Sequence, residues 1–314
     1  MTHLTRRRFL AISAAAPMLA GLAGLPAHAA AVTRWQGVAM GAAASIRLAH
    51  PDAKAITARV WAEIDRLENI FSLHRPDSAL TRLNATGRLD APPFELLECL
   101  SLCDAVHRAS GGLFDPTIQP LWQLYATRHA TGHAPEPAAI AEALTRVGWQ
   151  AVAFDATAVR LVRPGMALSL NGVAQGYVAD RVAALLAAEG LTDILVDTGE
   201  FRAIGGQPGG GDWPISLQAG ARLLPGTVAL RDQALASSAP RGTVFDAAGR
   251  VGHILNPLSG APAQSTWGLI SVTAPHAALA DALSTAMCLM SRTEITALLQ
   301  VFPAAGLAGL SESA

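Results

Sequence analysis

Lysine is almost absent from this chain of 314 residues, since Lys54 is its single example. Charged residues make up 15% of the sequence and the formal net charge is −1, so no basic field is available to attract nucleic acid. The hydrophobic content of 51% excludes a disordered chain. We therefore expect a globular protein that is long enough to bury a sizeable core.

Cysteine is scarce as well, with Cys99, Cys103 and Cys288 as the three examples. Cys99 and Cys103 are four residues apart on an expected helix, so they share one face of it. This spacing suits neither a zinc ribbon nor a relaxed disulfide. We expect all three thiols to be small core residues.

The first residues have the pattern of an export signal. Thr5-Arg6-Arg7-Arg8-Phe9-Leu10 is a twin-arginine motif, an apolar run rich in alanine and glycine follows, and small residues flank a cleavage position after Ala29. We expect residues 1–29 to be a cleaved twin-arginine signal peptide, with a structural N-terminal helix as the alternative. Cleavage removes three arginines and no acidic residue, so the net charge changes from −1 to −4. The expected product is soluble and periplasmic, and it has no lipid anchor because no cysteine lies near the cut.

Residues 30–314 have the pattern of one α+β domain with mostly antiparallel sheets flanked by helices. Apolar spacings of three and four predict helices over 51–70 and 93–110. A strand pair is expected around Met40-Gly41. We further expect helices over 137–147 and 177–189, and a last helix within 275–299. Loops are expected over 71–84 and 126–136, and strands over 152–170 and 193–197. A hairpin turn is expected at 206–211, where it joins an extended segment at 201–205 to its return strand at 213–218.

Residues 169–181 form the stretch around which we expect the fold to be organised. An alternating apolar strand ends at Leu170, a turn with glycine and asparagine follows, and an alanine-rich helix comes next. Glycine lets the backbone approach a ligand closely, and the free N–H groups of a helix N-terminus favour phosphate. An ordinary strand-to-helix turn is the alternative, because a glycine-rich turn alone is a weak motif.

Four short patterns could carry chemistry, and each has a structural alternative. Asp281 and Thr285 are four residues apart on an expected helix, so a carboxylate and a hydroxyl face one side. There they could hold Mg²⁺, or they could serve the helix itself as an N-terminal carboxylate and a back-bonded threonine. His253, at a strand end, could act as a base, bind a phosphate or be a rim histidine. The other two patterns are the acidic glycine turn at 197–200 and the aromatic–carboxylate pair at 114–115.

The order of these patterns along the chain resembles the ApbE family, the FAD:protein FMN transferases, over nearly the whole expected mature chain. The motifs that carry the resemblance are Met40-Gly41, Phe71-Ser72, Arg75-Pro76-Asp77-Ser78, Arg82-Leu83-Asn84, Gly111-Gly112-Leu113-Phe114-Asp115-Pro116-Thr117, Pro120-Leu121, residues 170–180, Gly199-Glu200, His253-Ile254 with Pro257, and Ala280-Asp281-Ala282-Leu283 with Thr285. So many ordered blocks are not expected by chance. The resemblance implies a single ApbE-like, T-fold-related unit.

The resemblance also implies a reaction and the residues that perform it. Enzymes of this family cut FAD between its phosphates, pass the FMN part to a threonine hydroxyl of a target protein and release AMP. The implied Mg²⁺ ligands are Asp281, Thr285 and a main-chain carbonyl, for which Gly172 is the first candidate and Ala174 the second. His253 is implied as a base or a phosphate-orienting group. The implied flavin and adenine contacts are Met40, His74, Leu113, Phe114, Asp115, Ser169 and Gln175.

The sequence departs from the family's frequent residues at some of these positions. Ser169 stands where the family often has aspartate, Asn171 where it has glycine, and Gln175 where it has lysine. One negative and one positive charge are therefore lost together. His74 stands where an aromatic residue is frequent, which weakens an argument for ring stacking on the flavin. The metal pair and the histidine remain, so we predict an active enzyme.

Three functions agree with such a site. The first is a periplasmic flavin transferase whose acceptor is a membrane electron-transfer subunit with a short Ser/Thr-Gly-Ala/Ser-Thr-like motif. A twin-arginine signal without a lipid anchor resembles the members that mature nitrous oxide reduction systems (NosX type). The second function is an FAD pyrophosphatase that gives FMN and AMP with water as acceptor. The third is a non-catalytic FAD-binding assembly factor.

Overall fold

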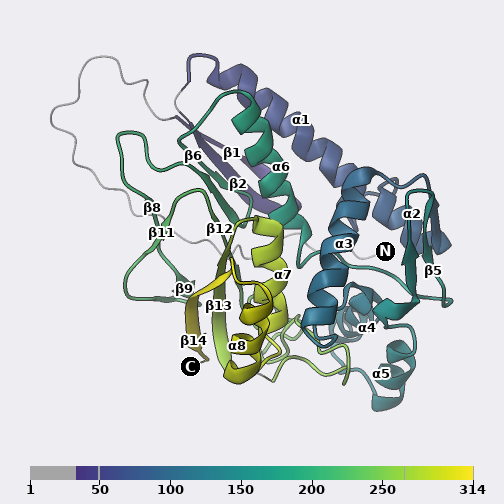
Figure 1. Cartoon of the computed structure of the whole chain (residues 1–314). Coiled ribbons are helices and arrows are strands. Elements are labelled where there is room, and N and C mark those ends of the chain that lie inside the picture. Colours follow the sequence, from purple (N-terminus) through teal and green to yellow (C-terminus); the bar gives the residue numbers. More distant parts are fainter. Residues whose placement is uncertain (1–32, 49, 265, 314) are drawn as a thin grey trace.

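The structure is a computed structural model that describes residues 33–48, 50–264 and 266–313. Within these ranges the chain forms a central antiparallel sheet, a smaller antiparallel sheet beside it and two short strand pairs, with helices packed around them (Figure 1). The α+β class with mostly antiparallel pairing is confirmed. The expected signal peptide at 1–29 lies outside the described residues. Across the described ranges, none of the helices combines the length and the apolar character needed to cross a membrane.

The central sheet starts with the hairpin expected around Met40. β1 (Thr33–Ala39) and β2 (Ala42–Leu48) pair in antiparallel register, and Met40 and Gly41 adopt left-handed backbone conformations at the turn. The order across the sheet is β1-β2-β6-β7-β12-β13-β14. The remaining strands are β6 (Ile194–Asp197), β7 (Phe201–Ile204), β12 (Ala234–Ser238), β13 (Trp267–Ala274) and β14 (Gly306–Glu312).

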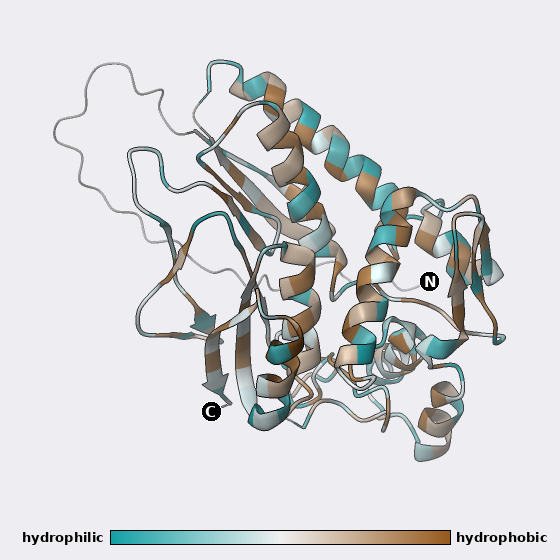
Figure 2. Cartoon of the chain, in the orientation of Figure 1, coloured by the Kyte–Doolittle hydropathy of each residue, from teal (hydrophilic) through white to brown (hydrophobic). Residues whose placement is uncertain are grey.

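Three helices cover one face of this sheet: α1 (Ala53–Phe71), α6 (Ala174–Ala188) and α7 (Ala277–Met287). Figure 1 shows α6 and α7 in front of the strands, with α1 alongside. α1 is the expected amphipathic helix. Figure 2 shows hydrophilic and hydrophobic residues alternating along this helix. α6 and α7 are rich in alanine, so their axes can approach closely. Their pairing brings the central stretch next to the helix that carries Asp281.

The opposite face of the sheet is covered by β8 (Trp213–Ile215), which pairs with β11 (Val228–Leu230), and by the short strands β9 (Gln218–Ala219) and β10 (Arg222–Leu223). The predicted hairpin between 201–205 and 213–218 was therefore wrong in its pairing. β7 lies inside the sheet between β6 and β12, so both of its edges are already occupied. The chain has to leave the sheet after β7 and form a separate layer.

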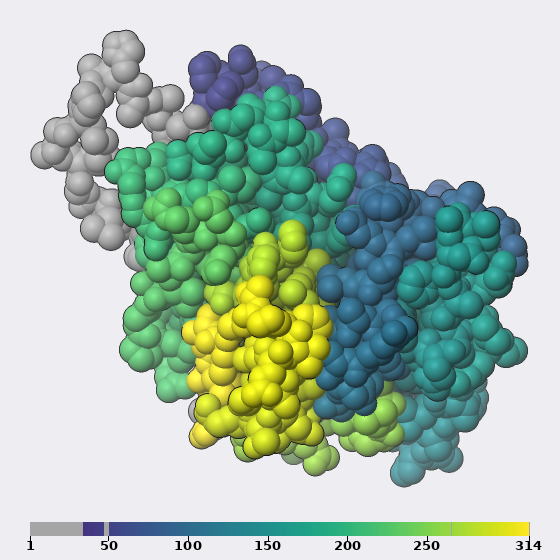
Figure 3. All heavy atoms as spheres, viewed as in Figure 1, coloured from purple at the N-terminus to yellow at the C-terminus, as the bar shows by residue number. Residues whose placement is uncertain are grey.

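The smaller sheet has the order β3-β5-β4, with β3 (Arg88–Asp90), β5 (Ala158–Leu161) and β4 (Val152–Phe154). Its surrounding helices are α2 (Ala79–Thr86), α3 (Phe94–Ala109), α4 (Gln119–Ala130) and α5 (Pro137–Leu144), with 3₁₀ turns η1 (Pro116–Ile118) and η2 (Trp149–Ala151). α3 packs on α7, and the surface view in Figure 3 shows the C-terminal residues directly beside it. One continuous core therefore joins both halves.

Two predicted loops were too long. The loop expected over 71–84 contains α2 from Ala79, because the Ser78 hydroxyl caps this helix by accepting a hydrogen bond from the N–H of Thr81 at 3.0 Å. The loop expected over 126–136 starts only after Ala130. There α4 continues because its aromatic side packs against Phe245.

One helix starts earlier than predicted, and one range contains a helix that the sequence did not predict. α6 begins at Ala174, before the expected start at Tyr177. The range 275–299, expected to contain the last clear helix, contains α7 and the first part of a further helix, α8 (Arg292–Val301). α8 begins where Ser291 and Glu294 form a capping box, which starts a new helix.

Residues 166–170, predicted as a strand, form no strand in the structure. Asn84 takes the place of a neighbouring strand. Its side-chain amide accepts a hydrogen bond from the N–H of Leu168 at 2.7 Å and donates one to the Leu168 carbonyl at 2.9 Å. Met166, Leu168 and Leu170 are buried, so the apolar alternation was real and its interpretation as a sheet strand was wrong.

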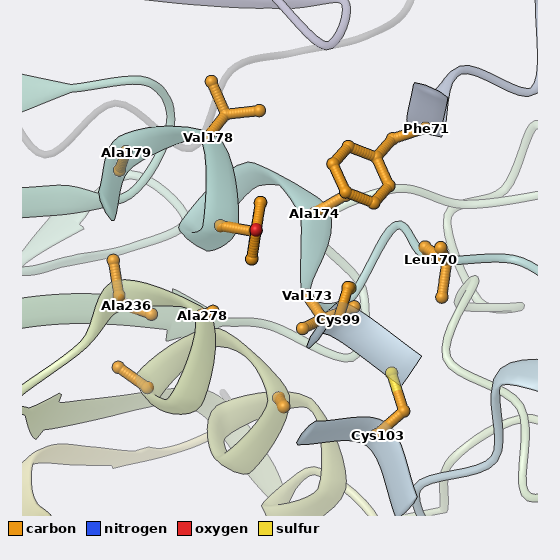
Figure 4. Packing of buried hydrophobic residues seen from close by; sticks show 14 of the residues in the cluster. Phe71, Cys99, Cys103, Leu170, Val173, Ala174, Val178, Ala179, Ala236 and Ala278 are labelled. Carbon is orange, nitrogen blue, oxygen red and sulfur yellow. The ribbon is translucent and has the colours of Figure 1, made fainter. Parts of the chain in front are cut away.

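The prediction of core cysteines is confirmed. Cys99, Cys103 and Cys288 are free thiols and each is fully buried. Figure 4 shows Cys99 close to Val173, at the start of α6, with Phe71 near Ala174. The first turn of α6 is thus anchored in the core.

Candidate active site

The start of α6 lies directly against the start of α7. A Cβ placed on Gly176 would lie 2.3 Å from the carbonyl oxygen of Ala277, which is too close for any side chain. Glycine is therefore required at 176 for the two helices to approach this closely. The approach places the turn that precedes α6 against the face of α7 that carries Asp281 and Thr285.

Asp281 is the buried carboxylate of this contact, at 4% exposure. Its Oδ2 accepts a hydrogen bond from the backbone N–H of Gly176 at 3.2 Å. Burial raises the pKa of this carboxyl to about 7, and the charge of Asp180 adds to the rise. A buried carboxylate in such surroundings is stabilised by a proton or by a bound cation.

Thr285 follows Asp281 by one helical turn and faces the turn before α6. A Cβ on Gly172 would lie 2.9 Å from Thr285 Oγ1, so only a glycine backbone can approach the hydroxyl in this way without a shift. On its other side, Ser238 at the end of β12 places its hydroxyl 3.3 Å from Thr285 Oγ1 and 2.7 Å from Ser284 Oγ. The three residues predicted to bind metal therefore lie in one place, and their role as ligands stays a prediction.

The chemistry of this group fits Mg²⁺. Carboxylate, hydroxyl and carbonyl oxygens are the hard ligands that Mg²⁺ accepts, and the ion commonly takes one or two carboxylates and completes its shell with water and phosphate oxygens. In the part of the chain that the structure describes, no three His, Cys, Asp or Glu side chains gather into a group that could hold a metal alone.

The turn after β6 supplies a second buried acid. Glu200 is 7% exposed and its Oε2 accepts a hydrogen bond from the N–H of Ser237 at 3.1 Å. Burial raises the pKa of Glu200 well above its ordinary value. The Thr198 hydroxyl donates to the carbonyl of Gln175 at 3.2 Å, and a Cβ on Gly199 would lie 3.1 Å from Gln175 Nε2. The acidic turn is thus held against the first turn of α6.

The helix end that was expected to bind phosphate is largely occupied by the protein itself. The N–H groups of Val173 and Ala174 both donate to the carbonyl of Leu170, and the N–H of Gly176 donates to Asp281. These bonds remove three donors from the predicted anion site. Phosphate binding at this point therefore has to depend on other groups more than on the helix end.

His253 lies within the long connection between β12 and β13. A Cβ on Gly252 would lie 2.0 Å from the carbonyl oxygen of Pro240, so the loop returns to its own start just before the histidine. His253 Nδ1 lies 3.0 Å from the carbonyl oxygen of Thr243. Because a carbonyl can only accept, Nδ1 carries the proton and Nε2 of the neutral ring is the free acceptor. Burial lowers the pKa of the ring and favours this neutral form.

Asp115 is a carboxylate that the protein uses to hold its own backbone. Its Oδ1 accepts hydrogen bonds from the N–H and the hydroxyl of Thr117 at 2.8 and 2.6 Å, and its Oδ2 accepts one from the N–H of Trp149 at 3.1 Å. These bonds fix the segment at 113–115.

The same segment is joined to the central stretch. The N–H of Ser169 donates to the carbonyl of Pro116 at 2.8 Å. Phe114 is buried and Leu113 is half-buried. The structure therefore joins Ser169 to Pro116, the residue that follows Asp115, and the role of these residues as ligand contacts stays a prediction.

Glu68 of α1 links the two remaining predicted flavin contacts. Its Oε1 accepts a hydrogen bond from the N–H of Met40 at 2.7 Å, and its other oxygen pairs with Arg75. Arg75 follows His74, whose side chain is exposed. Glu68 therefore ties the β1–β2 turn, which carries Met40, to the segment after α1, where the side chain of His74 lies on the surface.

Sequence reasoning missed several residues that hold this site. Ser238 could not be found from the sequence, because its contact with Thr285 joins a strand to a helix that follows much later. Ser284 precedes Thr285 and could have been considered with it. Glu68 lies on the polar side of an amphipathic helix, which carries no signal of its own. Asp180 was inside the central stretch, but its partners on α7 were unknown.

Comparison with known proteins gives consistent matches. The ApbE family profile matches residues 40–307. The FAD:protein FMN transferase of Treponema pallidum (strain Nichols) is 31% identical over 270 residues, which cover 78% of this chain and 74% of that protein. The FAD:protein FMN transferase of Klebsiella pneumoniae (strain 342) is 29% identical over 252 residues, which cover 77% of each chain.

Solved structures match over a similar length. The apo form of the Pseudomonas stutzeri flavinyl transferase ApbE is 26% identical, with a TM-score of 0.77 over 88% of this chain and 89% of that one. The ApbE protein of Thermotoga maritima has a TM-score of 0.79 at 24% identity and covers 90% of this chain and 97% of its own, which shows the shared fold.

Proposed function

The chain belongs to the ApbE family, and we propose that it transfers the FMN part of FAD to a hydroxyl group of a target protein, with release of AMP. The observation that carries the proposal is the meeting of Gly172, Asp281 and Thr285 at the α6–α7 contact, where a buried carboxylate faces a hydroxyl and a glycine backbone. The match to curated transferases along most of the chain supports the same reaction.

Asp281, Thr285 and the carbonyl of Gly172 would hold Mg²⁺ in this protein. When bound, the ion would supply charge neutralisation at the pyrophosphate, which is the main requirement of phosphoryl transfer. Asp281 would contribute its negative charge, and the N–H of Gly176 keeps one of its oxygens oriented. Ser238 would orient the Thr285 hydroxyl from the other side.

His253 would accept the proton of the attacking hydroxyl. The oxygen of the acceptor threonine forms a bond to the phosphorus of the FMN phosphate, and the bond from that phosphorus to the bridging oxygen breaks, so AMP leaves with the electron pair. Nε2 of the neutral ring is the atom that is free to take the proton. A role in orienting the phosphate is the alternative for the same residue.

The flavin and the adenine would be held by Met40, His74, Leu113, Phe114, Asp115, Ser169 and Gln175. Phe114 and Leu113 offer apolar surface, while Ser169 and Gln175 offer uncharged polar groups. Asp115 would act by keeping the segment at 113–115 in place, because its oxygens already accept bonds from the protein. Gln175 lies against the acidic turn at Gly199, so it would separate that turn from the ligand phosphates.

The N-terminal pattern supports the proposed compartment, and the resemblance to the family supports the proposed acceptor. A cleaved twin-arginine signal at 1–29 would deliver a folded protein to the periplasm. The target would be a membrane electron-transfer subunit with a threonine in a short Ser/Thr-Gly-Ala/Ser-Thr-like motif. Both statements rest on the sequence.

The products of FAD cleavage test the proposed reaction. The purified protein is incubated with FAD and Mg²⁺, with and without an acceptor domain that carries the threonine motif, and the nucleotides are separated by chromatography. AMP release that depends on the acceptor, without matching free FMN, supports the transferase. AMP and free FMN in equal amounts without an acceptor would indicate the pyrophosphatase, and intact bound FAD would indicate the assembly factor.

A further inference from the structure

Asp180 of α6 makes the contact that fixes the start of α7. Its Oδ1 accepts a hydrogen bond from the N–H of Ala277 at 2.8 Å, and its Oδ2 accepts one from the N–H of Ala278 at 2.9 Å. Arg202 of β7 places its Nε 3.4 Å from Oδ1. The first N–H groups of a helix have no partner within it, and the residue before α7, His276, provides no side-chain cap. A carboxylate from another helix therefore caps α7 and complements its dipole.

In the contact between α6 and α7, the backbone of each helix donates hydrogen bonds to a carboxylate of the other. Asp180 accepts from the backbone of α7, while the backbone of α6 donates from Gly176 to Asp281. The close approach of Gly176 to Ala277 joins residues that take part in these two sets of bonds. Three contacts along one helix pair fix both the sliding of α7 and its rotation about its axis. A rotated α7 would carry Thr285 away from the turn before α6.

We propose that Asp180 is a positioning residue for the metal site. It holds Asp281 and Thr285 in register with the turn at 171–173, and it does so through the backbone of α7 without touching the metal. This inference rests on the proposed function. Residues that orient metal ligands commonly contribute 10–100-fold to metal affinity, although they are not ligands.

The proposal is tested with Asp180→Asn, which keeps the shape of the side chain. Its oxygen can still accept one bond, but its NH₂ group then faces a backbone N–H, so one cap bond is lost. The probe is Mn²⁺, followed by electron paramagnetic resonance in the presence of ADP, which carries a pyrophosphate and no flavin. We expect the Kd for Mn²⁺ to rise by about 10-fold, while ADP binding in EDTA stays unchanged. Amide exchange at Ala277 and Ala278 becomes faster.

The matched control is Asp155→Asn. Asp155 Oδ1 accepts bonds from the N–H groups of Thr157 at 2.7 Å and Ala158 at 3.0 Å, in the turn between β4 and β5 of the smaller sheet. This carboxylate also accepts bonds from backbone N–H groups, although both end on its Oδ1, and it belongs to the turn of the smaller sheet and not to the α6–α7 contact. We expect the control variant to bind Mn²⁺ with wild-type affinity. Asp180→Ser, whose shorter side chain brings its hydroxyl less close to the two N–H groups, is a second variant, and we expect it to bind Mn²⁺ at least as weakly as Asp180→Asn.

Each outcome decides the proposal. Wild-type Mn²⁺ affinity in both Asp180 variants overturns the positioning role and leaves the proposed function intact. Equal weakening in Asp155→Asn traces the effect to general loss of stability and overturns the role as well. Two results would contradict the proposed metal site and the positioning role together. In the first the wild type binds no Mn²⁺, and in the second the wild type and the Asp281→Ala variant bind Mn²⁺ with the same affinity.

Discussion

Asp281 Oδ2 accepts a hydrogen bond from the backbone N–H of Gly176 at 3.2 Å, across the contact between α7 and α6. This bond joins the helix that bears the candidate metal carboxylate to the helix that follows the candidate carbonyl turn. It also opposes the effect of burial, because a hydrogen bond to a carboxylate favours its charged form. Ionisation of the buried Asp281 carboxyl therefore costs free energy unless a bound cation compensates the charge.

The stability of the metal-free protein is expected to fall as the pH rises through about 7. The pKa of Asp281 is raised from 3.8 to about 7 in the folded state, so between these values the folded protein binds more protons than the unfolded chain. The stabilising effect of this proton is complete below pH 3.8 and is lost as the pH passes 7. Thermal unfolding in EDTA between pH 5.5 and about 8.5 measures the slope, and Mg²⁺ should raise the Tm more at the alkaline end.

Asp281→Asn isolates this effect from the other buried acids. Burial also raises the pKa of Glu200 and Asp180, which therefore contribute to the slope in the same direction. We expect the Asn variant to show a smaller fall in Tm with pH than the wild type. Identical slopes for the two proteins would mean that Asp281 does not titrate in this range.

Gly172→Ala is expected to damage the site without strain in the backbone. The added Cβ would lie 2.9 Å from Thr285 Oγ1 and 3.1 Å from its methyl carbon, so the turn and the helix must separate by a few tenths of an ångström. We expect the Mg²⁺ concentration for half-maximal transfer to rise about tenfold, with a loss of stability of about 1–2 kcal/mol.

A second substitution checks the cause. Thr285→Ser removes the methyl group and keeps the hydroxyl, so in the Gly172→Ala background it should recover part of the loss. If the double variant behaves as the sum of two independent losses, the contact between these residues is not the reason for the effect.

The sequence predicted the elements that depend on a local pattern of residues. It did not predict the features that depend on contacts between residues far apart in the chain. α1, α3 and the β1–β2 hairpin follow from apolar spacing and turn residues, and their predictions are confirmed. The segment at 166–170 looked like a strand because its alternation is genuine. Its backbone partner is the side chain of Asn84, which no local pattern can reveal.

In the candidate site, too, local spacing was predictable and contacts between distant residues were not. Asp281 and Thr285 share a helical face, which their spacing of four residues predicts. That the face is turned toward Gly172 depends on the close approach of α6 and α7, and thus on the missing side chain of Gly176. Ser238 enters the site from β12, and only the sheet order determines which residue ends there.

His253→Gln is expected to lower the transfer rate by about 100-fold or more, because a positioned base commonly contributes this much. FAD binding should change little if the residue acts as a base. In the wild type the acidic limb of the pH–rate profile should lie below pH 6.5, since burial lowers the pKa of the ring. The variant should lose this limb. A large rise in the KM for FAD with an unchanged acidic limb would instead identify His253 as a phosphate ligand.

Export should depend on the pair of arginines at the start of the motif. Arg6→Lys combined with Arg7→Lys is expected to keep the precursor in the cytoplasm at full length, whereas Arg8→Lys serves as the control in the same motif and should be exported. Cell fractionation and the N-terminal sequence of the periplasmic form provide the measurement. Processing at a position other than after Ala29, or export of the double variant, would contradict the assignment of 1–29.

The measurement that tests the central claim most directly is the intact mass of an acceptor domain after incubation with the mature protein, FAD and Mg²⁺. The account predicts an added mass equal to FMN less one water on a threonine of the acceptor. The addition should be absent with EDTA and with Asp281→Ala, since both remove the metal site built on the α6–α7 contact. An adduct that forms equally well with Asp281→Ala, or an acceptor that stays unmodified while FAD is cleaved to free FMN and AMP, would contradict the account.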